Sequence, residues 1–359
     1  MRLWALLGFV VYGCHGTFQQ LADSNERMLA SSADMPKSRV HSNPLLTTLR
    51  HWGRYAASTY QRYEDWDNCT DCQAPDIAET ELNSTWSTAL PAFSRGYVGI
   101  HHGRREVVVA FRGTTHIMDT LSDAQIAQVP WPPSSDGSDT IDGTSRVHWG
   151  FLLAYKAAQL QIRDALETIA RDARLADYSL HFVGHSLGAA QATLAFVDYS
   201  LGYPEYSNEK GRKAGRTFPR SCSLVTFGSP RVGNLQFIRL VDSPSTCVGW
   251  HRRSDDKLDE SVLRVVHESD IVPHLPRSML LLGRYSHAGR ETWARDAAGE
   301  AASEIIICSH HADDGKEDPQ CSAGTSPLGW NILDHLVYPG IQLHILPDFL
   351  HPLAPLANV

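Results

Sequence analysis

The sequence lacks a surplus of basic residues. Its 32 lysines and arginines are outnumbered by 40 aspartates and glutamates, which gives a formal net charge of −8. Proteins that bind nucleic acid by neutralising phosphates need a basic surface, and so do proteins held electrostatically on anionic lipid. The composition therefore argues against a nucleic-acid partner and predicts that any contact with a lipid surface is apolar.

Long apolar runs are also missing. Apart from the stretch Leu3–Gly13, no run approaches the ~20 residues that a transmembrane helix needs. That stretch follows Arg2 and is succeeded by a small residue, Gly16, and then by polar chain, which is the pattern of a secretory signal peptide. We expect a signal peptide over residues 1–16, no transmembrane segment and a secreted, extracellular protein. A short membrane anchor is the weaker alternative.

Cysteine is scarce, with seven in 359 residues. Loss of Cys14 with the signal peptide leaves an even number, as is typical of disulfides in exported proteins. We expect pairing within the local sets Cys69–Cys72 and Cys308–Cys321, which leaves Cys222–Cys247 by elimination. Zinc is the competing interpretation of Cys69-x-x-Cys72. It is disfavoured because no second Cys/His pair follows at a suitable spacing.

The chain contains no internal repeat and no low-complexity block that would divide it. With 42% hydrophobic and 20% charged residues it can bury one large core. Residues 17–44 are polar and without periodicity, so we expect a mobile leader or pro-segment there, followed by one domain over 45–359. The sequons at Asn68 and Asn83 predict glycosylation on the secretory route, Asn68 less so because Cys69 beside it is expected to be bonded.

Apolar periodicity alternates between the helical and the extended type along the chain. Helices are expected over 45–63, 149–175 and from 186 to about 197, and strands over 97–100, 106–111, 178–183, 223–227 and 262–266. This alternation predicts an α/β fold with a mostly parallel sheet covered on both faces.

The segment Gly184-His185-Ser186-Leu187-Gly188 matches the G-x-S-x-G nucleophile elbow, between an expected strand and an expected helix. The turn holds the serine in a strained conformation, and larger side chains at the two glycines would collide with the neighbouring strand and helix. The N–H groups that follow Ser186 lie at a helix N-terminus, where partial positive charge favours an oxyanion. The pattern predicts Ser186 as a nucleophile.

A serine hydroxyl needs a base, and the base needs an orienting carboxylate. In this fold the order is Ser, then Asp or Glu, then His. Asp270 and Glu268 follow an expected strand and are the candidate acids. The histidines beyond them are His274, His287, His310, His311, His335, His344 and His351. The pattern alone leaves the choice open.

Five ordered motifs resemble the fungal-type class 3 lipases over roughly residues 45–340. They are Phe111-Arg112-Gly113-Thr114, the elbow, Phe227-Gly228-Ser229-Pro230-Arg231-Val232-Gly233-Asn234, Asp270-Ile271-Val272-Pro273-His274-Leu275-Pro276 and Asp334-His335-Leu336. The resemblance implies an α/β-hydrolase fold with Asp270 as the triad acid and His335 as the base.

The same resemblance implies roles for further residues. Thr114 and Leu187 would form the oxyanion hole, whose donors each typically contribute ~10²–10³ in rate. Arg112 would place the oxyanion loop through hydrogen bonds, and His274 and His287 would be structural, hydrogen-bonded histidines.

The family uses the segment after Thr114 as a lid. Ile117, Leu121 and Ala124 fall on one helical face with Met118 beside them, which predicts a modest apolar underside. Thr120 stands where many relatives have an aromatic residue. We therefore expect weak interfacial activation and keep a soluble ester among the expected substrates.

These features predict a secreted serine ester hydrolase that acts through an acyl-enzyme without a metal or organic cofactor. The leading substrate class is acylglycerol, acted on at a lipid–water interface. A feruloyl-type esterase acting on plant cell-wall esters is the nearest alternative, and a catalytically silent secreted binding protein is the alternative of another class. The sequence leaves chain-length preference and oligomeric state open.

Overall fold

The computed structural model describes residues 39–40, 44–88, 93–114, 127–131, 144–201, 219, 221–243, 261–277, 284–297, 300–309 and 314–343. The chain divides into two units, Met1–Ser38 and Arg39–Val359, and every described residue belongs to the second. The expected signal peptide, Cys14, Cys247 and all the expected lid residues (Ile117, Met118, Leu121 and Ala124) lie outside the described residues.

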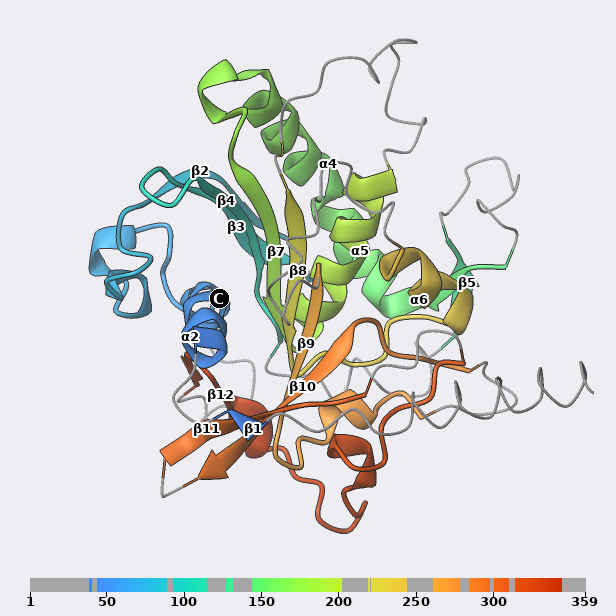
Figure 1. Ribbon diagram of the computed structural model, residues 1–359. Coiled ribbons are helices and arrows are strands. Elements are labelled where there is room, and N and C mark those ends of the chain that lie inside the picture. Colours follow the sequence, from blue (N-terminus) through green and yellow to red (C-terminus); the bar gives the residue numbers. More distant parts are fainter. Residues whose placement is uncertain are drawn as a thin grey trace, which may run out of the picture. The chain divides into compact units, whose positions relative to one another are not determined.

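A nine-stranded sheet organises this unit, in the order β1-β11-β10-β9-β8-β7-β4-β3-β2 (Figure 1). The central strands β4, β7, β8, β9 and β10 are parallel, and the outer pairs are antiparallel. Its strands are β1 Arg39–Val40, β2 Thr80–Ser87, β3 Arg95–His101, β4 Glu106–Phe111, β7 Ser179–His185, β8 Cys222–Phe227, β9 Val262–His267, β10 Arg290–Ala297 and β11 Glu300–Ile307. Two small antiparallel pairs join β5 Gln128–Pro130 to β6 Arg146–His148 and β12 Val337–Tyr338 to β13 Ile341–Gln342.

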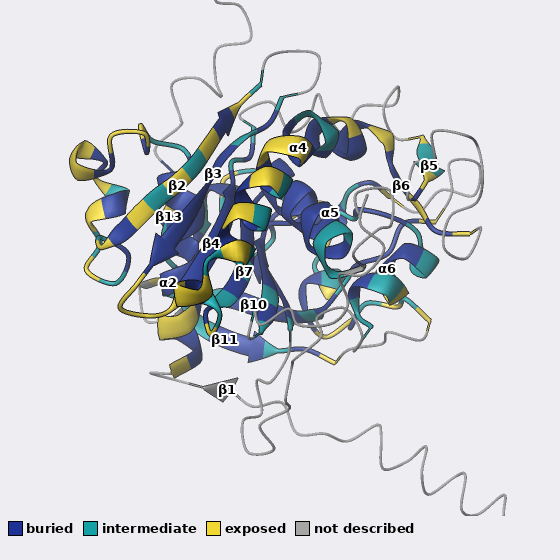
Figure 2. Ribbon diagram, turned by 90° about the horizontal axis from the view of Figure 1, so that it is seen from above, coloured by how far each residue is buried: buried dark blue, intermediate teal, exposed yellow. Residues whose placement is uncertain are grey.

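Helices cover both faces of this sheet. Helix α2 (Pro44–Ser58) packs on one face, and α4 (Trp149–Arg171), α5 (Leu187–Leu201) and α6 (Leu235–Val241) pack on the other. Along β4, Val107 and Val109 enter the core of the second group, while Val108 and Ala110 enter the core under α2. A strand buried on both faces has a continuous apolar sequence, and Figure 2 shows the buried central strands beside helices exposed on their outer sides.

The expected α/β-hydrolase arrangement is confirmed, with corrections to element ends. The first helix ends at Ser58 and not near residue 63. At this end, Ser58 Oγ and Thr59 Oγ1 donate hydrogen bonds to the carbonyl oxygens of Tyr55 and Ala56. Helix α4 ends at Arg171, and Ala173–Leu175 form a separate 3₁₀ turn. Within the expected leader, Arg39–Val40 pair with β11 as an edge strand.

Strands β2, β10 and β11 have no counterpart in the sequence-based expectation. Strand β10 contains four ionisable residues in the run Arg290–Asp296, and this masks its apolar pattern. The charge is tolerated in a parallel sheet because it is paired: Glu291 is 2% exposed and lies 3.1 Å from Arg264 of β9. Because this counter-charge comes from the neighbouring strand β9, the local sequence of β10 could not reveal it.

Candidate active site

Ser186 occupies the tight turn between β7 and α5. Its φ is +61°, in the left-handed region that a side chain rarely adopts, and the residue is 1% exposed. A Cβ on Gly184 would lie 2.3 Å from the carbonyl oxygen of Gly188, and a Cβ on Gly188 would lie 2.3 Å from that of Phe111. The close packing expected of the two elbow glycines is therefore present.

Asp270 and His335 meet behind this turn. Asp270 follows β9 and is fully buried, and His335 lies in the 3₁₀ turn Asp334–Leu336 and is 2% exposed. Nδ1 of His335 is 2.6 Å from Oδ2 of Asp270, while Oδ1 accepts the backbone N–H of Val272 at 2.8 Å. A carboxylate only accepts hydrogen bonds, so Nδ1 carries the proton and Nε2 is the basic nitrogen.

In the described part of the chain, the serine oxygen and the second ring nitrogen of the histidine lack hydrogen-bond partners. Among the described residues, neither Ser186 Oγ nor His335 Nε2 has a hydrogen-bond partner, although both are buried. Backbone contacts hold the two residues close together: Ser186 N donates to Phe227 O at 2.9 Å, and a Cβ on the next residue, Gly228, would lie 2.8 Å from the ring of His335. Catalytic hydrogen bonds often tighten only with substrate bound, so this geometry suits a nucleophile and base awaiting a substrate.

The side chain of His185 contacts the backbone of His335. Its Nε2 lies 2.8 Å from the carbonyl oxygen of His335 and therefore donates, which leaves Nδ1 to accept the hydroxyl of Tyr60 at 2.7 Å. Burial lowers the pKa of His185 well below its ordinary value, with the nearby His335 adding to the effect. His185 is thus neutral, as this hydrogen-bond pattern requires.

Two site residues were missed by sequence reasoning. Tyr338 donates its hydroxyl to Oδ2 of Asp270, and burial, reinforced by the negative charge of Asp270, raises its pKa well above the ordinary value. Tyr60 supports His185. Neither tyrosine lies in a motif with a chemical signature, and only the fold brings them to the site.

The expected oxyanion-hole residues flank Ser186. Leu187 is buried and is the first residue of α5. Thr114 directly follows Gly113, where a Cβ would lie 2.8 Å from that of Ser186. Arg112 lies in the same loop: its backbone N–H donates to Arg95 O at 2.8 Å, and its guanidinium lies over the rings of Tyr60 and Phe93, at 5.5 and 6.0 Å from their centroids. Among the described residues its Nε has no hydrogen-bond partner.

The competing acid and histidines have other contacts. Glu268 accepts the N–H of Asp296 at 2.8 Å and lies against Arg295. His287 donates to Pro273 O at 2.7 Å, as a structural histidine would. His274 instead stacks on Trp330 at 4.0 Å between ring centroids, with burial lowering its pKa to about 4. The histidines at 310, 311, 344 and 351 lie outside the described residues.

The cysteines form disulfides where the structure describes them. Cys69 is bonded to Cys72 and Cys308 to Cys321, the two local pairings expected, and Cys222 is also disulfide-bonded. Bonded cysteines offer no thiolate, which removes the zinc interpretation of Cys69-x-x-Cys72. It equally removes a metal at Glu291, Cys308 and Cys321, a group close enough in the described structure to bind one.

Surface features complete the description. Both sequon asparagines, Asn68 and Asn83, are exposed, and the Asn68 amide donates to Asp65 at 2.9 Å. Within the described ranges, no helix combines the length and apolar character required to cross a bilayer.

Comparison with known proteins gives a consistent result. Residues 108–279 match the family model described as lipase (class 3). A lipase of Rhizomucor miehei is 28% identical over 308 residues, which cover 85% of this chain and 71% of the relative. The secreted mono- and diacylglycerol lipase 2 of Gibberella zeae is 28% identical over 340 residues, with 86% and 75% covered. A solved triacylglycerol lipase, in which a serine protease triad forms the catalytic centre, superposes with a TM-score of 0.63 at 26% identity, with 86% of this chain and 98% of that one covered.

Fold and comparison together define an α/β-hydrolase that cleaves carboxylic esters. Its sheet order, its elbow after β7 and the likeness to lipases over most of the chain all point to one family. Over residues 108–279 the chain resembles the class 3 lipases, and the named lipase relatives support the same family.

Proposed function

We propose that the protein is a secreted acylglycerol lipase that acts through an acyl-enzyme on Ser186. The observation that carries this proposal is the buried acid–base pair, Asp270 Oδ2 and His335 Nδ1 at 2.6 Å, set behind a serine strained at φ +61° whose Oγ has no hydrogen-bond partner among the described residues. Such an arrangement serves nucleophilic attack on an ester carbonyl.

His335 Nε2 takes the proton of Ser186 Oγ as the oxygen attacks the ester carbonyl, and the imidazolium returns it to the departing alcohol. Asp270 holds the imidazole with Nδ1 protonated and stabilises the imidazolium. The N–H of Leu187 and the N–H and hydroxyl of Thr114 bind the oxyanion. Water, deprotonated by the same Nε2, then attacks the acyl-enzyme and releases the carboxylic acid and Ser186.

Acylglycerol is the proposed substrate because the relatives are named lipases and mono- and diacylglycerol lipases. Secretion is supported by the names of relatives and by disulfides, which persist in oxidising compartments. The expected lid over residues 117–124 stays a prediction, and so do the signal peptide over residues 1–16 and the leader or pro-segment over residues 17–44.

Labelling and substrate choice test this function. The wild-type protein should react with a fluorophosphonate, because only an activated serine does so, and Ser186→Ala should remove both labelling and hydrolysis. Rates on emulsified tributyrin, triolein and methyl ferulate then assign the substrate. Turnover of methyl ferulate far above that of either glyceride would replace the lipase proposal by the feruloyl esterase alternative. Unchanged labelling of Ser186→Ala would refute the nucleophile.

A further inference from the structure

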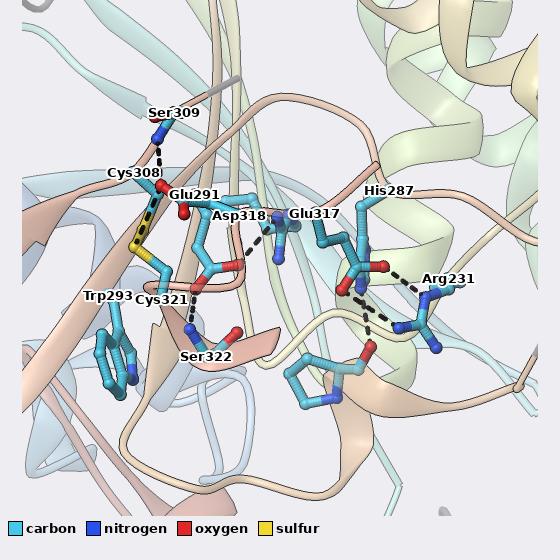
Figure 3. A network of polar contacts seen from close by, with 12 residues as sticks. Arg231, His287, Glu291, Trp293, Cys308, Ser309, Glu317, Asp318, Cys321 and Ser322 are labelled. Atoms are coloured by element: carbon cyan, nitrogen blue, oxygen red, sulfur yellow. Dashed lines mark hydrogen bonds and ion pairs between the residues drawn. A yellow bond between two sulfur atoms is a disulfide. The ribbon is translucent and has the colours of Figure 1, made fainter. Parts of the chain in front are cut away.

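Arg231 lies at the centre of a buried ion-pair network next to the segment that carries Asp270. Its guanidinium meets the carboxylate of Glu317 with two parallel contacts, Nε to Oε1 at 2.8 Å and Nη2 to Oε2 at 3.1 Å (Figure 3). The two side chains are only 12% and 17% exposed. A bidentate pair fixes the plane of the guanidinium, so the direction of the third nitrogen, Nη1, is fixed as well.

That nitrogen holds the segment after Asp270. Nη1 of Arg231 donates to the carbonyl oxygens of His274 and Pro276, at 3.0 Å for the latter, and the backbone N–H of Arg231 donates to Leu275 O at 2.8 Å. His287 adds a bond to Pro273 O at 2.7 Å. Four successive carbonyls, from Pro273 to Pro276, therefore accept hydrogen bonds from Arg231 or His287.

Two of these carbonyls, those of Pro273 and His274, belong to the turn that holds the Asp270 carboxylate. The 3₁₀ turn Val272–His274 begins at the residue whose N–H donates to Asp270 Oδ1 at 2.8 Å, and ends at the residue whose carbonyl Arg231 binds. A shift of the turn moves this N–H and with it the carboxylate. Asp270 Oδ2 is in turn the partner of His335 Nδ1.

Glu317 is itself held in place. It lies in the loop closed by the Cys308–Cys321 disulfide, and its neighbour Asp318 accepts the N–H of Ser309 at 2.9 Å across that loop (Figure 3). Glu317, which fixes the Arg231 guanidinium, therefore lies in a loop that is closed by a disulfide bond.

We propose that Arg231, braced by Glu317, is a positioning residue that sets the carboxylate of Asp270 against His335. This inference rests on the proposed function of the Ser186 site. Arg231 touches no reacting atom and acts through the turn at Val272–His274.

Single substitutions measure this role. Arg231→Gln should lower kcat on a soluble short-chain ester about 100-fold and Glu317→Gln about 10-fold, since small misplacements of catalytic groups are this costly, with KM unchanged. In the same variants the low-field proton resonance of His335 Nδ1–H should broaden or move upfield. The matched control is Arg104→Gln, which removes the contacts of Arg104 Nε with both carboxylate oxygens of Glu106, at 3.2 and 3.1 Å; Glu106 begins β4, at the opposite end of that strand from Gly113. It should keep wild-type kcat and the resonance.

A double substitution separates positioning from stability. A buried ion pair replaced by apolar residues of similar volume often costs no stability, so Arg231→Met with Glu317→Leu should unfold at a temperature near that of wild type. Its kcat should stay about 100-fold low, because no donor reaches the carbonyls of His274 and Pro276. A folded double variant with wild-type kcat would overturn the inference. If the double variant does not fold, wild-type kcat in Glu317→Gln would overturn it instead. Failure of the proposed function appears separately, as hydrolysis retained by Ser186→Ala.

Discussion

Tyr338 donates its hydroxyl to Asp270 on Oδ2, the same carboxylate oxygen that faces Nδ1 of His335. The tyrosine is 2% exposed, and its raised pKa keeps the hydroxyl protonated and donating at any working pH. The Asp270 carboxylate thus accepts hydrogen bonds from the Tyr338 hydroxyl, the His335 ring and the backbone N–H of Val272. Of these three donors, we expect His335 to take part in proton transfer.

Tyr338→Phe should lower kcat about 10-fold on a soluble ester. A hydrogen bond to a charged group contributes ~1.5–3 kcal/mol, and ~1.4 kcal/mol corresponds to tenfold in rate. Tyr63→Phe is the control, because the Tyr63 hydroxyl contacts Trp86 O, Gly96 O and the Arg95 side chain among the described residues, and none of these is a triad residue. Equal kcat in wild type and Tyr338→Phe would show that this bond does not orient the acid for catalysis.

The assignment of the acid is tested by two amide substitutions. Asp270→Asn should reduce kcat by about 10⁴, as expected when the orienting carboxylate no longer fixes the tautomer of the base. Glu268→Gln should change kcat little, since the Glu268 side chain accepts the N–H of Asp296 and lies against Arg295. The reverse ranking of the two variants would make Glu268 the acid.

Gly228→Ala should fold and lose activity. Gly228 has φ +56°, and a Cβ there would lie 2.8 Å from His335 Cε1 and 3.0 Å from Asp270 Oδ2. We expect kcat to fall about 100-fold. Gly289→Ala provides a control with similar strain at φ +70° against Val262, and it should lower the melting temperature while sparing kcat. Similar kcat losses in both variants would point to general destabilisation.

The two described disulfides should differ in their contribution to stability. Chain-entropy arguments assign about 3 kcal/mol to a loop the size of Cys308–Cys321, whose cysteines are 13 residues apart, and less to Cys69–Cys72, which are 3 apart. Replacing each pair with serines and measuring urea unfolding checks this order. A larger loss from the Cys69–Cys72 pair would contradict it.

His148 should make the protein less stable as the pH falls. Its Nδ1 accepts the N–H of Phe151 at the start of α4, and burial lowers its pKa to about 4 from an ordinary 6.5. The unfolded chain thus binds a proton between these two values that the folded chain does not, so the contribution is fully present above pH 6.5 and is lost as pH falls toward 4.

The corresponding measurement compares wild type with His148→Asn, which can still cap α4 but does not titrate. Between pH 7 and pH 5 the wild type should lose about 2 kcal/mol more unfolding free energy than the variant, given 1.36 kcal/mol per pKa unit. Parallel stability profiles for the two proteins would refute the role of His148.

The residues that meet at the candidate site could be proposed from the sequence because each of their motifs is local. The elbow needs two glycines, a serine and the adjoining strand and helix, all within one short segment, and the ordered motifs indicated Asp270 and His335. The strands β4, β7, β8 and β9 could be expected because burial on both faces forces a continuous apolar run. Their parallel order followed from the helices between them.

Other features exist only in the folded chain. Asp270 and His335 are 65 residues apart, and Tyr338 and Tyr60 carry no motif that would link them to the site. Strand β10 was missed because its charges are neutralised by a neighbouring strand, and the Arg231–Glu317 pair joins residues 86 apart. Local propensity and periodicity report the backbone preference of a segment and the face it buries. Which distant charges and hydrogen-bonding groups meet depends on the packing of the whole sheet, and that was decided by the tertiary structure alone.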